Sequence, residues 1–204
     1  MGLPGPLVES REAGVYRSFK INGVPAISII SIPTLTTIFH ALIVAAIIAL
    51  TGAPLFGGTA PTNWGMFALL TLITAFAIGA IGALIGVIAN SSRATVLLSQ
   101  AVFLPSMMIG GLMMPLDILP ESVRSFSGLL PSTHAMQALM GLAYGRETVL
   151  DPWVCAGVLL ASGLVSFGLA VYLFNWDSRN NARRGHPAMA LIALVPYIAG
   201  ILLG

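Results

Sequence analysis

Few residues in this chain could carry catalysis or bind a metal ion. The 204 residues include three histidines and one cysteine, and no HExxH motif or other spacing of histidines and carboxylates suits zinc. There is no GxxxxGK[ST] phosphate loop, so we do not expect the chain to bind ATP as P-loop proteins do. The lone Cys155 excludes an internal disulfide and a cysteine-based metal cluster. The sequence therefore predicts no catalytic residue, no metal site and no cofactor bound by this chain.

His40 and His134 are the histidines for which a role can be argued. His40 falls about midway along an expected membrane span, and an ionisable group there is a candidate for a transport pathway because contact with lipid is unfavourable. A neutral histidine hydrogen-bonded between helices is the alternative, and we favour it. His134 is expected at the water edge of a short polar helix. An intramembrane hydrolase with Ser162 is disfavoured, because a serine in a span more often bonds its own backbone or packs as a small residue.

The elements that must position these side chains are membrane helices. Mean hydropathy is +0.94, 57% of the residues are apolar and only 8% are charged, against about 25% charged residues in an ordinary soluble domain. The small net charge of +2 lies in short loops, so it indicates orientation in a membrane and not binding of nucleic acid. The first 20 residues lack an apolar core, so a cleavable signal peptide is not expected.

We predict an all-α fold, a polytopic helical membrane protein with about five transmembrane helices. Residues 1–25 are expected to be a cytoplasmic segment, irregular over residues 1–7 and forming one amphipathic helix from Val8 to Lys20. Residues 26–204 form the transmembrane domain. A GxxxG pair, Gly82 and Gly86, should let a neighbouring helix approach closely. The expected spans are residues 26–50, 64–89, 94–114, 153–174 and 187–204.

Between the third and fourth spans, residues 115–150 read as a helix-break-helix hairpin. Pro120 and Glu121 suit the start of a first short helix. Pro131 breaks the chain, and Ser132 could cap a second helix that contains His134. Bent or polar backbone at membrane depth must be buried in protein or line a wet cavity. We therefore predict a re-entrant hairpin and not a lipid-facing span.

The distribution of positive charge predicts on which side this hairpin lies. If the hairpin returns to its own side, the nine Lys and Arg residues divide seven against two; if it crosses, they divide five against four. The positive-inside bias favours the first arrangement. We expect a multi-pass protein of the bacterial cell membrane with a cytoplasmic N-terminus, an outer hairpin and an outer C-terminus.

The order of these features resembles a known family. Three pairs occur in order: Met114-Pro115, which ends the GGLMMP stretch of the third span, and then Leu119-Pro120 and Leu130-Pro131 in the hairpin. Glu12-x-Gly14 precedes the first span. Over roughly residues 9–176 the chain is similar to the permease subunits of type-2 ATP-binding-cassette (ABC) exporters. Members of that family normally have six spans, two of them before this segment, and they usually end soon after the span at residues 153–174.

The resemblance implies roles that composition could not supply. Glu12, Gly14, Arg17 and Phe19 would belong to a coupling helix that docks on an ATPase subunit, which would bind ATP and Mg²⁺. The hairpin residues Pro115, Pro120, Glu121, Pro131 and His134 would close the outer end of a pathway for an export substrate of unknown identity. A second permease chain, identical or different, would complete the transporter in the bilayer. A truncated or accessory membrane protein without transport of its own is the alternative reading, and an intramembrane enzyme is a weaker one.

Overall fold

The computed structural model describes residues 3–176 and 185–203, and the regular structure in these ranges is helical throughout. Four helices are long and apolar enough to cross a membrane: α3 (Ala26–Phe56), α4 (Trp64–Ile88), α5 (Ser92–Ile109) and α8 (Pro152–Leu173). A shorter apolar segment follows, η3 (Pro187–Leu194) continued by α9 (Val195–Leu203). The predicted fold class, an all-α polytopic membrane protein, is confirmed.

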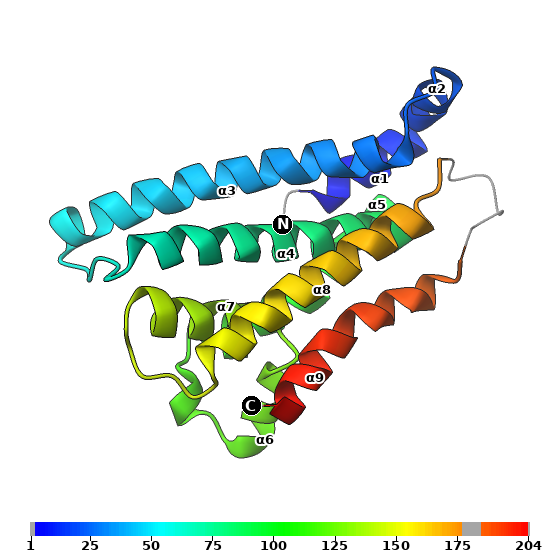
Figure 1. The fold of residues 1–204 in the computed structure, drawn as a ribbon. Helices are drawn as coiled ribbons and strands as arrows, with labels where there is room; N and C mark the ends of the chain where they lie inside the picture. The colour runs from blue at the N-terminus through cyan, green and yellow to red at the C-terminus, as the bar shows by residue number, and fades with distance from the viewer. Residues whose placement is uncertain (1–2, 177–184, 204) are drawn as a thin grey trace.

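Helix α4 lies at the centre of the bundle, with α3 on one side and α8 on the other (Figure 1). Helices α4 and α8 run parallel, since Leu70 packs near Cys155 whereas Ala83 lies in the same cluster as Ala170. Close approach between them depends on Gly163, where a Cβ atom would come within 2.8 Å of the Phe76 ring. Small residues at the contact allow this packing.

The first 25 residues differ from the prediction. Helix α1 (Pro4–Glu12) begins where irregular chain was expected, because Pro4 suits a first helical position. The expected single helix over residues 8–20 is instead two helices, α1 and α2 (Val15–Ile21), since Gly14 adopts φ +75° between them. A left-handed residue cannot continue a right-handed helix. We call residues 4–21 the elbow.

The partner of the GxxxG pair in α4 is the elbow and not another span. A Cβ atom at Gly86 would lie 3.0 Å from Leu7 and 3.2 Å from Pro4, and one at Gly82 would lie 3.6 Å from Pro4. Val8, on the same side of α1, is fully buried. The small residues of α4 therefore hold the elbow against the bundle.

Residues 115–150 form the hairpin from short pieces. These are η1 (Leu116–Ile118), α6 (Glu121–Ser127), α7 (Pro131–Ala138) and the π-helix η2 (Leu139–Ala143). Because α4 and α8 are parallel and the short turn at residues 89–91 reverses the chain into α5, the hairpin starts and ends at one end of the bundle (Figure 1). We call this the hairpin end, and the opposite end, with α1, α2 and residues 89–91, the elbow end.

Several boundaries differ from the predicted ones. Helix α3 continues to Phe56, because Pro54 does not stop it and Gly57 with φ +66° does. Helix α5 ends at Ile109, five residues earlier than expected. The last apolar segment begins with 3₁₀ geometry at Pro187 before it becomes α-helical. The other ends of helices α3, α4, α5 and α8 lie within two residues of the predicted bounds.

Candidate functional site

Two consecutive residues of the elbow hold the turn between α4 and α5. The guanidinium of Arg11 donates to the carbonyl oxygen of Val87 at 2.9 Å and to that of Ala89, and Arg11 is 6% exposed. The last carbonyls of a helix lack intrahelical donors and favour a cation. The Glu12 carboxylate accepts a hydrogen bond from Ser92 Oγ at 3.1 Å, where the start of α5 favours an anion. The elbow therefore grips both sides of one turn.

The role of Arg11 was not predicted from the sequence, although a signal was present. Pro4, Leu7, Val8 and Arg11 recur at helical spacing and are the buried residues of α1. An arginine in phase with the apolar face of a short helix is expected to meet acceptors inside the protein, since a buried charge must be paired or hydrogen-bonded. Its acceptors lie 76 and 78 residues away, which local spacing cannot reveal.

The four elbow residues named from the family resemblance are not placed alike. Arg17 and Phe19 lie on the exposed side of α2, and Phe19 is 41% exposed. Gly14 forms the bend, and Glu12 is bonded to Ser92. Tyr16 points inward against Phe174, with ring centroids 5.5 Å apart, and burial raises the pKa of its phenol. One face of the elbow thus packs against the bundle, and the other face, with Arg17 and Phe19, is exposed.

The hairpin is tied to the bundle by hydrogen bonds from α7. Ser132 Oγ donates to the carbonyl oxygen of Ser106 in α5 at 3.0 Å. The prediction that Ser132 caps the second helix is wrong: α7 begins at Pro131 with Leu130 as its N-cap, so Ser132 lies inside the first turn and bonds α5. Gln137 Oε1 accepts from the backbone N–H of Val149 at 2.8 Å and of Leu150 at 3.1 Å. Helix α7 is therefore fixed at both ends.

The prolines predicted in the hairpin occupy turn and helix-start positions. Pro115 precedes η1, and Pro120 is the N-cap residue of α6, which starts at the exposed Glu121. Pro131 is the buried first residue of α7. The Arg124 side chain donates to backbone carbonyl oxygens of η1 and its flanks, those of Leu116, Asp117 and Leu119. Prolines therefore mark the starts of the short helices of the hairpin, and the Arg124 side chain links α6 to η1 by hydrogen bonds.

His134 is buried, contrary to the expectation that it lies at the water edge. It is 2% exposed, its Nε2 donates to the Gly128 carbonyl oxygen at 2.8 Å, and its ring centroid is 5.4 Å from that of Tyr197. Helix α9, which carries Tyr197, covers His134. Nothing in the sequence of the hairpin indicates this contact. Burial lowers the pKa of His134, and the bond to the Gly128 carbonyl opposes this only in part.

The stability of the hairpin is expected to fall in mild acid because of His134. Its folded pKa is lowered, so below the ordinary value of about 6.5 the unfolded chain binds the proton more readily than the folded one. Stability is retained above pH 6.5 and lost as pH falls toward the folded pKa. Each kcal/mol lost lowers the melting temperature by about 2–4 °C.

Thermal unfolding of the detergent-solubilised chain at pH 7.5 and 5.5 measures this effect. A His134→Gln variant should lose most of the extra drop at pH 5.5 that the unaltered chain shows. An equal drop in both proteins would assign the acid sensitivity elsewhere.

His40 does not bridge two helices, contrary to the favoured interpretation. It is exposed on α3, and its Nδ1 lies 2.7 Å from the carbonyl oxygen of Thr36 in the same helix. A carbonyl only accepts, so Nδ1 carries the proton. His40 is thus satisfied locally, and a role in a pathway stays a prediction.

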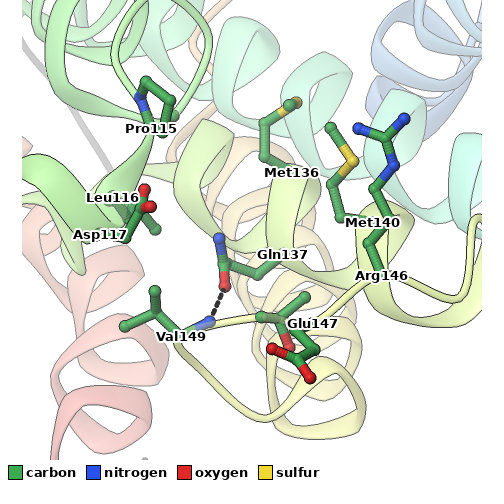
Figure 2. A pocket seen from close by; sticks show the side chains of 11 residues that line it. Pro115, Leu116, Asp117, Met136, Gln137, Met140, Arg146, Glu147 and Val149 are labelled. Atoms are coloured by element: carbon green, nitrogen blue, oxygen red, sulfur yellow. Dashed lines mark hydrogen bonds between the residues drawn. The ribbon is translucent and has the colours of Figure 1, made fainter.

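A pocket of about 460 Å³ opens within the hairpin. Figure 2 shows Gln137 at its centre, with Asp117 to one side, Glu147 on the loop before α8, and Met136 and Met140 along one wall. Where residues are described, no three side chains of His, Cys, Asp or Glu gather as metal ligands. The pocket offers a charged rim and an apolar wall.

Comparison with known proteins adds two findings. The family model described as ABC-2 type transporter matches residues 5–144, from α1 through the hairpin. The linearmycin resistance permease protein LnrN of Bacillus subtilis (strain 168) is 26% identical over 170 residues, which cover 82% of this chain and 43% of that protein. The chain thus spans less than half the length of this relative. No solved structure matches the chain.

Proposed function

Since the chain belongs to the ABC-2 type transporter family, we propose that it is a membrane permease subunit of an ATP-driven exporter. A separate ATPase subunit would bind ATP and Mg²⁺, and this chain would form part of the path that the substrate takes through the bilayer. The relative that covers most of the chain is named as a permease, which supports the proposal. The bundle of four long apolar helices supplies the membrane-spanning part.

The observation that carries the proposal is the grip of the elbow on the α4–α5 turn. The elbow exposes Arg17 and Phe19 to a docking partner and bonds the bundle through Arg11 and Glu12. Movement of the elbow would therefore act on α5, whose Ser106 carbonyl holds the hairpin through Ser132. A continuous set of contacts thus joins the open face of the elbow to the opposite end of the bundle.

We place the elbow end in the cytoplasm and the hairpin end outside a bacterial cell membrane. Among the described residues, Arg11, Arg17, Lys20 and Arg93 lie at the elbow end, whereas Arg124 and Arg146 lie at the hairpin end. The positive-inside bias supports this orientation. A second permease chain would complete the pathway.

Complex formation with an ATPase subunit tests the proposal. We expect the chain to co-purify with an ATPase encoded by a neighbouring gene and to change its rate of ATP hydrolysis in proteoliposomes. An accessory protein that packs with a complete permease is the alternative function. Co-purification with another permease and no ATPase contact of its own would support that second function.

Gly14 provides a specific test of the elbow. Its φ is +75°, and space around it is open, so a substitution acts through the backbone alone. Gly14→Ala should cost about 1–2 kcal/mol, and Gly14→Pro, which fixes φ near −65° and removes the N–H that bonds the Arg11 carbonyl, should abolish transport. Gly5→Ala in α1, with open space and no positive φ, is the matched control and should transport normally. Unchanged transport in the Gly14→Pro variant would reject the elbow as the coupling element.

A further inference from the structure

An apolar groove of about 720 Å³ runs between α3 and α4 at the hairpin end. Most of the α3 residues that line it are small and spaced about one helical turn apart: Thr37, Ala41, Ala45, Ala49 and Ala53, with Gly52 and the larger Ile48 beside them. From Thr37 to Ala53 the groove extends about 24 Å at 1.5 Å per residue. It is an elongated space and not a gap left by one missing side chain.

The groove continues toward the hairpin through a smaller pocket of about 320 Å³. The two share four lining residues, Thr59, Phe67, Leu139 and Tyr144, so they form one passage. The walls are apolar apart from threonine hydroxyls and Tyr144. One of those hydroxyls, that of Thr74, is buried without a hydrogen-bond partner.

Arg146 is the one charged residue among those that line the groove and the smaller pocket. It lies at the hairpin end of the passage and is exposed, and its Nη2 donates to Thr59 Oγ1 at 2.9 Å. Arg146 also lines the pocket in the hairpin, together with Asp117 and Glu147, but in Figure 2 the Glu147 side chain points away from the Arg146 guanidinium. The passage is therefore apolar along its length and cationic at one end.

We propose that this passage binds a single-chain anionic amphiphile, with the apolar chain between α3 and α4 and the acidic group on Arg146. Hydrocarbon walls favour an apolar chain over water. A guanidinium presents several donors to a carboxylate or phosphate. The inference concerns ligand binding by this chain and does not depend on the proposed coupling to an ATPase.

Fluorescence quenching with brominated stearic acid measures binding directly. Trp64 packs against Phe67, a lining residue, with ring centroids 6.0 Å apart, so a bromine in the groove should quench its emission. The protein is the full chain in neutral phosphatidylcholine nanodiscs. We expect saturable quenching that is lost in a Trp64→Phe variant.

Two substitutions separate the head and the chain of the ligand. Arg146→Gln should weaken binding of the acid about tenfold or more, because a hydrogen bond to a charged group is lost, and should leave binding of the brominated methyl ester unchanged. Ala49→Phe should block both ligands. Ala46→Phe lies on the same helix but is exposed and outside the groove, so it should block neither.

The binding data can also overturn the inference. Equal affinity for the acid and the methyl ester in the unaltered chain would show that Arg146 does not bind the acidic group. Equal quenching in the Ala46→Phe and Ala49→Phe variants would show that the ligand does not bind in the groove. Competition by phosphatidylglycerol, and not by added phosphatidylcholine, would identify a membrane lipid as the source of the same chemistry. A groove that binds neither acid nor lipid would contradict the proposal and favour coverage by another protein segment.

Discussion

Replacing Arg11 by methionine is expected to uncouple ATP hydrolysis from transport. The change keeps an unbranched side chain on the buried face of α1 and removes both donors to the Val87 and Ala89 carbonyls. Each carbonyl left without a donor costs about 1–3 kcal/mol, so α1 should detach readily from the end of α4. Coupling between two sites usually changes an affinity by about 5–150-fold. We expect the rate of transport to decrease by a factor in that range, while ATP hydrolysis by the partner continues.

The measurement compares ATP hydrolysis and substrate export in the same proteoliposomes. Lys20→Met is the matched control, since Lys20 is a cation on the exposed side of α2. It should leave both the attachment of α1 to α4 and export close to normal. Arg11→Lys should be intermediate, because an ammonium keeps the charge and lacks the planar fork that reaches two acceptors. Normal export and an unchanged melting temperature in Arg11→Met would show that the contact transmits nothing.

The spans and the family could be predicted because their signals are local. Runs of apolar residues locate α3, α4, α5 and α8 to within a few residues except at the ends of α3 and α5. Three Met-Pro and Leu-Pro pairs in order indicated the ABC-2 permease family, and the match to residues 5–144 confirms it. Proline acts through its own φ and its missing N–H, so its spacing is informative without tertiary structure.

The contacts that define the sites could not be predicted, because they join distant parts of the chain. Arg11 reads locally as one charge of an amphipathic helix, yet it bonds residues 76 and 78 positions away. His134 reads as polar, yet Tyr197 of α9 covers it. Gly82 and Gly86 predict that a neighbouring helix packs closely, but they do not identify that helix as α1. In each case the residue type was a correct signal and the partner was set by the fold.

A Gly110→Ala substitution is expected to be the most destabilising single-methyl change at the hairpin end. Gly110 follows α5, and a Cβ atom there would overlap both Ser132 Oγ and the Ser106 carbonyl oxygen. These two oxygen atoms form the hydrogen bond that holds α7 on α5. Overpacking costs about 1–3 kcal/mol, and loss of the buried hydrogen bond adds about 1–3 kcal/mol. Together these costs of about 2–6 kcal/mol should lower the melting temperature by about 4–24 °C.

A double-mutant cycle shows whether the overlap acts through Ser132. Ser132→Ala alone removes the hydrogen bond. In a Gly110→Ala/Ser132→Ala protein the new methyl group no longer meets a hydroxyl oxygen, but it still meets the Ser106 carbonyl oxygen and the Cβ atom of residue 132. The two changes should therefore be less than additive, because neighbours that share one contact do not act independently. Gly157→Ala in α8, where a Cβ atom meets nothing within 4 Å, should leave the melting temperature unchanged or raise it slightly. Full additivity would mean that α7 is held by contacts other than the Ser132 bond, and the hairpin would then have no direct hydrogen-bonded link to the helix that the elbow grips.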